Sequence, residues 1–231
     1  MAGGYHRDVR GAIAALILTV ASSAAAGPSA KPAPAPKPST DELAASCHAA
    51  LDERGVAWKP AQRPGIALAV EIAGPLGGVA YVPPAREPLV IDCSLAVSLA
   101  DAGRYLTALG LVEARWSSAY SRRNVRGTHR PSNHSYGLAI DVPRWSGPVL
   151  GLVSIAADYE QGLGDAVDCL GQPATQAGAI LKVAQCQLAQ SGLFFLVLSP
   201  DYDDAHHDHF HLEAKPWGER PTVRADRPAI H

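Results

Sequence analysis

A short segment near the carboxyl end of the chain is rich in histidine. The 231 residues include nine histidines, and four of them fall within six consecutive positions, where even placement would put about 0.2. These four are His206, His207, His209 and His211. Polar and apolar residues then alternate, which predicts a strand with His209, His211 and Glu213 on one face and Phe210 and Leu212 on the other. A strand is a rigid element that can hold imidazole rings against a metal ion.

A second segment supplies the other ligands that a metal site needs. The apolar run 138–140 leads into Asp141, and Gly137 permits a turn between this run and His134. Together, His134, Asp141 and His211 form a mixed nitrogen and oxygen set. Zinc takes such ligands at about 2.0–2.2 Å, and three protein ligands with a position left for water are typical of a catalytic site. The alternative is a histidine-rich surface loop and an ordinary buried aspartate, but the two segments together favour a metal site.

These motifs resemble those of known families. One pattern is Ser132-x-His134-x-x-Gly137-x-Ala139-x-Asp141 followed by His209-x-His211. It resembles the signature of the LAS zinc metallopeptidases, which include D-Ala-D-Ala peptidases and penicillin-insensitive murein endopeptidases. A closer resemblance is to the bacterial extensin-like C-terminal domain, a family usually placed beside those peptidases. The segments that carry it are Arg130-x-Ser132-x-His134, Pro200-Asp201-Tyr202 and Ala205-His206-x-Asp208-His209-Phe210-His211-Leu212. The resemblance covers roughly residues 43 to 214. It implies a LAS-type, hedgehog-like Zn²⁺ site with the ligands His134, Asp141 and His211.

The chemistry of such a site assigns further roles. Bound zinc lowers the pKa of water to about 7 and polarises an amide carbonyl. His209 lies two residues from His211 on the same predicted face, and the resemblance also makes it the general acid and base. His206 matches a second active-site histidine of the murein endopeptidases. Asp208 is a candidate to orient a histidine by accepting its N–H.

Three more residues are expected near the site. Arg130 and Ser132 precede His134 and are candidates to bind a substrate carboxylate or to steady an oxyanion. A surface salt bridge is nearly as good an interpretation of Arg130. Glu213 lies on the predicted ligand face of the strand, where we expect a partner of the site rather than a ligand.

The amino-terminal region is typical of an exported protein. Residues 1–26 have the weakly basic start, short apolar run and small-residue cleavage site of a secretory signal peptide. The apolar run is shorter than the ~20 residues of a membrane span, and an uncleaved membrane anchor is the alternative. Residues 27–40 form a Pro/Ala-rich linker, either extended or without a positional role. Residues 41–215 then form the extensin-like domain, and residues 216–231 an irregular tail.

Hydrophobic periodicity predicts an α+β fold. Helices are expected from Thr40 or Asp41 through Leu51, from Asp92 through Leu109, and near 175–190. Strands are expected at 66–72, 79–82, 111–120 and 149–157, and a buried strand at 193–198. We therefore expect a small, mostly antiparallel sheet that carries His211 and Asp141, with helices packed on one face.

The four cysteines suit an exported protein with two disulfides. Three pairings are open, and we favour Cys47–Cys93, which ties the first helix to the next, with Cys169–Cys186, which closes a short loop. A four-cysteine zinc site is disfavoured because no Cys-x-x-Cys spacing occurs. Many extensin-like domains have a cysteine in the segment that corresponds to 121–123, and this chain has none there, so its pairing can differ from the family's.

Composition restricts the partners. The chain is 47% hydrophobic and 18% charged with a formal net charge of −2 and no basic block, which argues for a globular protein and against a nucleic-acid partner. We expect a monomer in the periplasm or cell envelope, with no membrane span in the mature chain. Two functions are open: a zinc-dependent peptidase or amidase acting on peptidoglycan peptides, or a non-catalytic wall-binding or structural module that keeps the metal site. A free coordination position favours the first, and a plugged site or a fourth protein ligand favours the second.

Overall fold

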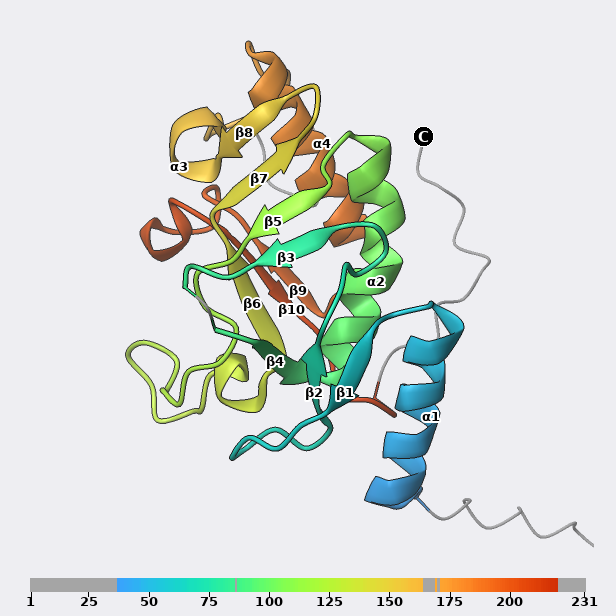
Figure 1. The fold of residues 1–231 in the computed structure, drawn as a ribbon. Coiled ribbons are helices and arrows are strands. Elements are labelled where there is room, and N and C mark those ends of the chain that lie inside the picture. The colour runs from blue at the N-terminus through green and yellow to red at the C-terminus, as the bar shows by residue number, and fades with distance from the viewer. Residues whose placement is uncertain (1–36, 86, 164–168, 170, 220–231) are drawn as a thin grey trace, which may run out of the picture. The chain divides into compact units, whose positions relative to one another are not determined.

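The computed structural model describes residues 37–85, 87–163, 169 and 171–219. Within them the chain forms an α+β unit with small sheets and few helices, as the sequence predicted. The helices are α1 (Thr40–Glu53), α2 (Cys93–Ala108), α3 (Ile155–Asp158) and α4 (Gln176–Gln190), and the 3₁₀ turns are η1 (Asn133–Tyr136) and η2 (Asp204–His206). α2 contacts both α1 and α4, and Figure 1 shows α2 and α4 running together on one side of the strands.

The described strands form three small sheets rather than one, and one of the three is antiparallel and carries His211 and Asp141, as predicted. Two are antiparallel, β1–β2–β4 and β6–β10–β9, whereas β3–β5–β7–β8 includes the parallel pair β3–β5. The strands are β1 (Trp58–Pro60), β2 (Ala69–Ile72), β3 (Ala80–Val82), β4 (Leu89–Asp92), β5 (Glu113–Arg115), β6 (Ala139–Val142), β7 (Arg144–Gly147), β8 (Gly151–Ser154), β9 (Leu196–Leu198) and β10 (Phe210–Glu213). Each of these strands has only three or four residues.

The first helix begins with a capping box. Ser39 Oγ accepts a hydrogen bond from the backbone N–H of Glu42, and the Glu42 carboxylate accepts one from the Ser39 N–H at 2.7 Å. The cap is therefore Ser39, one residue before the predicted Thr40 and two before the predicted Asp41.

The next two long helices begin where the sequence predicted. The Asp92 carboxylate accepts from the N–H of Ser94 at 2.9 Å to cap α2, and Thr175 Oγ1 accepts from the N–H of Gly178 at 3.0 Å to cap α4. Most of α2 is buried, because it packs against α1, α4 and the strands β2 and β4.

The strand predicted at 111–120 is shorter in the structure. Only β5 remains of it, because the chain leaves that sheet and crosses to β6. There the N–H of Ser117 donates to the carbonyl of Asp141 at 2.9 Å, and the N–H of Asp141 donates to the carbonyl of Ser118 at 2.8 Å. The crossing places Ser118 beside the candidate ligands.

Two other predicted strands were also too long. The segment 149–157 forms β8 and then α3, because the Asp158 carboxylate accepts from the N–H of Ser154 at 2.7 Å and begins a helical turn. The segment 193–198 forms only β9, which is an edge strand. For that reason Leu196 is partly exposed, and the prediction of a buried strand was wrong in this respect.

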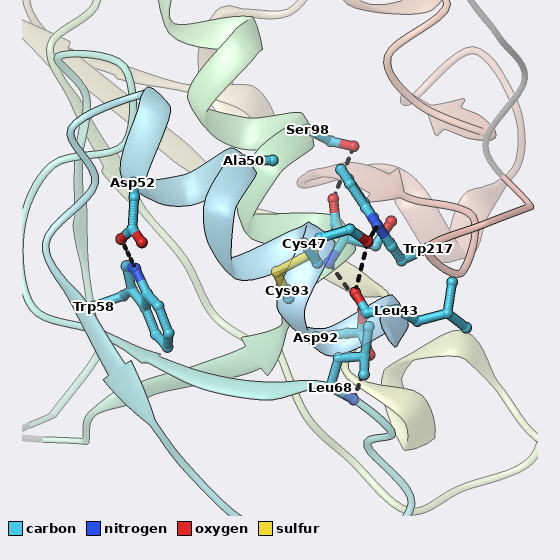
Figure 2. Close-up of a disulfide and its surroundings, with 12 residues drawn as sticks. Leu43, Cys47, Ala50, Asp52, Trp58, Leu68, Asp92, Cys93, Ser98 and Trp217 are labelled. Carbon is cyan, nitrogen blue, oxygen red and sulfur yellow. Dashed lines mark hydrogen bonds between the residues drawn. A yellow bond between two sulfur atoms is a disulfide. The ribbon is translucent and has the colours of Figure 1, made fainter. Parts of the chain in front are cut away.

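Both predicted disulfides are confirmed. Cys47–Cys93 joins α1 to the start of α2, and both of its residues are fully buried (Figure 2). Beside it, Trp217 Nε1 donates to Ser46 Oγ at 2.8 Å, which ties the segment after β10 to α1. The second bond, Cys169–Cys186, joins a loop residue to α4.

Several predicted segments lie outside the described residues. These are the signal peptide or membrane anchor at 1–26, the linker up to residue 36 and the tail from residue 220. Residues 216–219 are described, and they contain no regular element. In the described part of the chain, every helix is too short or too polar to span a membrane.

Candidate metal centre

Strand pairing brings two of the predicted ligands together. β10 lies between β6 and β9, and its antiparallel register with β6 sets His211 opposite Asp141. Phe210 and Leu212 are fully buried in the core, so His211 faces the other side of the strand, as the alternation predicted. The strand begins one residue after His209. A register shift of one residue would turn His211 away from Asp141.

The third predicted ligand comes from η1, just before β6. Ser132 Oγ accepts from the N–H of His134 at 3.4 Å, and Gly137 ends the turn with a φ of +63°. A Cβ at Gly137 would come within 2.6 Å of the Ile66 side chain and 2.9 Å of the Asp92 nitrogen. Glycine alone suits both this backbone conformation and this close approach. The turn holds the His134 ring fully buried.

The ligand atoms of these three residues converge. His134 Nε2 lies 3.2 Å from Asp141 Oδ1 and 3.3 Å from His211 Nδ1, and the last two atoms are 2.7 Å apart. Ligand atoms of a tetrahedral zinc site with bonds of 2.0–2.2 Å lie about 3.4 Å from one another. All three observed separations are shorter than this, most of all that between Asp141 and His211, so a zinc ion requires the ligand atoms to move apart. Two imidazole nitrogens and one carboxylate oxygen also match the donor set of catalytic zinc, so these residues fit the metal.

The charges of the cluster are strongly coupled. Burial alone would raise the pKa of Asp141, but hydrogen bonds and positive charge from His134 and His211 outweigh burial and hold the pKa well below its usual range. Burial would lower the pKa of His211, but the hydrogen bonds and charges of Asp141 and Glu213 raise it to about 9. Without a metal, His211 is therefore protonated at neutral pH. A cation would take the place of its Nδ1 proton.

Outer contacts orient the ligand rings. His211 Nε2 lies 2.9 Å from Glu213 Oε1, and the other oxygen of Glu213 accepts from Asn133 Nδ2 at 2.8 Å. The second ring nitrogen of His134 is 3.4 Å from Ser118 Oγ. Partners of this kind set which nitrogen of a histidine faces a metal. The sequence analysis expected Glu213 here but missed Asn133, whose contact with Glu213 spans 80 residues, and Ser118, which reaches His134 through the crossing from β5 to β6.

His209 lies at the edge of the cluster. Its Nδ1 is 2.7 Å from Asp208 Oδ1, and its Nε2 is 3.5 Å from Asp141 Oδ1. The hydrogen bond to His209 lowers the pKa of Asp208. The structure therefore brings both of these predicted residues together, with one ring nitrogen held by a carboxylate and the other facing the candidate ligands.

His206 lies on the same side of the cluster. Its ring centroid is 5.2 Å from that of His209 and 5.6 Å from that of His211. Its Nδ1 is 2.5 Å from Asp203 Oδ1, a contact that the sequence analysis missed. The spacing of three residues within a short turn was the available signal, because it brings Asp203 back to His206.

Arg130 and Ser132 occupy different surroundings. Arg130 is on the exposed, arginine-rich loop 121–130 and lines a cavity of about 540 Å³ with Asn133, Phe195 and Lys215. None of the three candidate ligands lines that cavity. Ser132 is buried and caps the turn that carries His134. Their roles in substrate binding stay predictions.

Comparison with known proteins supports one part of the resemblance. Residues 162–223 match the family model described as the extensin-like protein C-terminus. This segment includes His206, His209 and His211. It does not include His134 and Asp141, which lie before its first residue. No curated protein and no solved structure matches the chain.

Proposed function

We propose that this chain is an exported, zinc-dependent peptidase or amidase that hydrolyses amide bonds in peptidoglycan peptides, as the LAS metallopeptidases do. The observation that carries the proposal is the convergence of His134, Asp141 and His211, with the Nε2 of His209 beside them. When bound, zinc supplies Lewis acidity, which polarises a carbonyl and lowers the pKa of water. The two disulfides support export, since such bonds persist in oxidising compartments.

His209 is the residue to which we assign proton transfer. Asp208 holds its Nδ1, which leaves Nε2 as the nitrogen that faces the reacting atoms. As general base, Nε2 takes a proton from the attacking water, and as general acid it returns a proton to the leaving amine. The Asp208 carboxylate stabilises the ring while it is positively charged.

Residues around His209 bind and orient the substrate. His206 is held by Asp203 in the same manner, and it borders the same space. Arg130 is exposed on the loop that precedes the ligand turn, where its guanidinium can bind a carboxylate of a stem peptide. Ser132 acts chiefly by fixing the position of His134, with oxyanion binding as its second assigned role.

The number of ligands separates an enzyme from a closed metal site. Among the described residues, the groups able to hold a metal contain three side chains each, and none contains four. A site with three protein ligands keeps a position for substrate or water, whereas structural zinc sites are almost always closed by four. This favours the peptidase over the wall-binding module.

The test is digestion of purified peptidoglycan, with soluble products resolved by mass. We expect peptide products from the zinc-loaded protein, none after chelation, and recovery when zinc is restored. The zinc-loaded His209→Ala variant should release almost no peptide products. The matched control is His207→Asn, because His207 is exposed and its Nδ1 contacts the carbonyl of Asp204 rather than the cluster. If the protein binds zinc and sediments with peptidoglycan but releases nothing, the wall-binding module is the correct function.

A further inference from the structure

The candidate ligands form two overlapping groups. The ligand atoms of His134, Asp141 and His211 lie within 4.8 Å of one another, and so do those of His206, His209 and His211. We call the first group the inner triad and the second the outer triad. His211 belongs to both.

The outer triad is oriented as metal ligands usually are. Asp203 lies against Nδ1 of His206, and Asp208 lies against Nδ1 of His209. A carboxylate on one ring nitrogen directs the lone pair of the other toward a metal. Imidazole ligands of this kind suit Zn²⁺, Co²⁺, Ni²⁺ and Cu²⁺. The outer triad therefore has the chemistry of a cation site, although it lacks the carboxylate ligand of the inner one.

Burial increases from the outer triad to the inner one. The side chains of His206 and His209 are 17% and 16% exposed, that of His211 is 9% exposed, and that of His134 is completely buried. The two carboxylates that hold the outer rings are about half exposed. Negative groups at the solvent side raise the local concentration of cations and the rate at which they bind.

We propose that the outer triad is a loading position, at which a divalent metal ion binds first and from which His211 passes it to the inner triad. The proposal rests on the metal centre of the proposed function but not on hydrolysis. The rings of His206 and His209 are more exposed than the side chains of His134 and Asp141, so an ion that arrives from solvent can reach the outer triad first. His211 makes the transfer by keeping its bond to the ion while the other ligands change.

The two positions cannot be filled together. Glu213 occupies Nε2 of His211, so only Nδ1 is free for a metal, and one nitrogen lone pair binds one ion. While the ion is at the loading position, His209 is a ligand and cannot move a proton. Transfer to the inner triad releases His209 for catalysis. The loading position therefore also explains why His209 faces the metal without belonging to the inner triad.

The first experiment measures Co²⁺ binding at equilibrium, by visible absorption and elemental analysis. We expect the wild-type protein to bind one Co²⁺. His134→Ala should still bind one, more weakly, with the absorption of a different ligand set. Adding His206→Asn to that variant should abolish binding, whereas adding His207→Asn should not. If folded His134→Ala binds no Co²⁺, or if the second substitution has no effect, the loading position is refuted. If the wild-type protein binds none, the proposed metal centre itself is wrong.

The second experiment leaves the buried ligands intact, in case His134→Ala does not fold. Metal-free wild-type, His206→Asn and His207→Asn proteins are mixed with Co²⁺ in a stopped-flow instrument. We expect His206→Asn to load more slowly than the wild-type protein, because it lacks one ligand of the loading position, and to reach the same final absorption. His207→Asn should load at the wild-type rate. Equal rates for all three proteins would overturn the proposal.

Discussion

Two buried carboxylates, Asp92 at the end of β4 and Asp141 in β6, have opposite electrostatics. They are 4% and 6% exposed. Asp92 accepts hydrogen bonds from the backbone N–H groups of Leu68 and Ser94, at 3.1 and 2.9 Å, and burial still raises its pKa to about 6 (Figure 2). Asp141 faces two imidazoles, which hold its pKa well below the usual range in spite of burial. The charge of a buried carboxylate therefore depends on whether its partners are charged side chains or neutral amides.

The difference separates a structural region from a candidate functional one. Asp92 joins a strand, a loop and the first turn of α2, next to the Cys47–Cys93 disulfide. Asp141 joins side chains that come from separate parts of the chain. The two regions touch where the N–H of Asp92 donates to the carbonyl of Gly137 at 2.9 Å. We expect substitutions in the first region to alter stability and those in the second to alter metal binding or turnover.

The largest effects should come from the two histidines of His209-Phe210-His211. His211→Ala removes a ligand, so metal affinity should fall by more than the 10- to 100-fold that loss of an outer partner alone typically costs, and activity should fall with it. His209→Ala keeps the inner triad, so equilibrium metal content should stay while turnover drops by about 10²- to 10⁴-fold, or roughly 3 to 5 kcal/mol of barrier. Elemental analysis measures the metal content of each variant, and the rate of peptidoglycan hydrolysis measures its turnover.

The opposite pattern would reverse these assignments. Loss of metal in His209→Ala with retention in His211→Ala would make His209 the ligand. Unchanged metal content in both variants would mean that the site lies elsewhere. His207→Asn again serves as the control, since it should change neither quantity.

A smaller effect, confined to stability, is expected from the Cys47–Cys93 bond. It closes a loop with a sequence separation of 46 residues, and the chain-entropy relation gives about 4 kcal/mol for a loop of that length. Cys47→Ala with Cys93→Ala should lower the free energy of unfolding by this amount in urea titrations, with Co²⁺ affinity unchanged. The Cys169–Cys186 bond, with a separation of 17, should contribute about 3 kcal/mol. A change in metal affinity on removal of Cys47–Cys93 would contradict the separation of the two regions.

The smallest effect is the pH dependence that Asp92 adds to the free energy of unfolding. Its pKa rises from 3.8 in the unfolded chain to about 6 in the folded protein. The folded state therefore binds the proton more tightly, and the stability from this group is complete below pH 4 and is lost as the pH rises to 6. At about 1.4 kcal/mol per pH unit the loss approaches about 3 kcal/mol.

The substitution Asp92→Asn isolates the contribution of this carboxyl group to the pH dependence of stability. Asparagine still caps a helix, and the hydrogen bond that it loses to Leu68 costs the same at every pH. Relative to wild type, the variant should therefore be more stable at pH 7 than at pH 4, by up to about 3 kcal/mol in urea unfolding. A difference between the two proteins that does not change with pH would show that Asp92 titrates as an exposed carboxylate. Metal binding should be the same in both.

The sequence predicted which candidate ligands converge better than it predicted their surroundings. His134, Asp141 and His211 come from motifs, and the period-two pattern put His211 and Glu213 on one face because β10 is regular there. Ser118 was not predicted, because its position depends on the crossing from β5 to β6, which has no local sequence pattern.

The starts of the three long helices α1, α2 and α4 were also predictable to within one or two residues, since each has a capping side chain close in sequence. The three sheets were not, because strands of three or four residues pair according to tertiary contacts rather than their own periodicity. The exposed edge strand β9 shows the same limit: its apolar sequence predicts burial, but its place in the sheet decides exposure.

The arginine-rich loop 121–130 has a consequence for cleavage of the chain. Four of its arginines are exposed, namely Arg122, Arg123, Arg126 and Arg130, and exposed loops are the usual sites of proteolytic nicking. The loop lies outside both disulfide-closed segments, so a trypsin-like cut there leaves two fragments with no covalent bond between them. Each fragment keeps its own disulfide, and pairing between β5 and β7 spans the cut. The second fragment carries every histidine and aspartate of both triads, so a nicked protein held together by strand pairing would retain all the residues of the candidate metal centre.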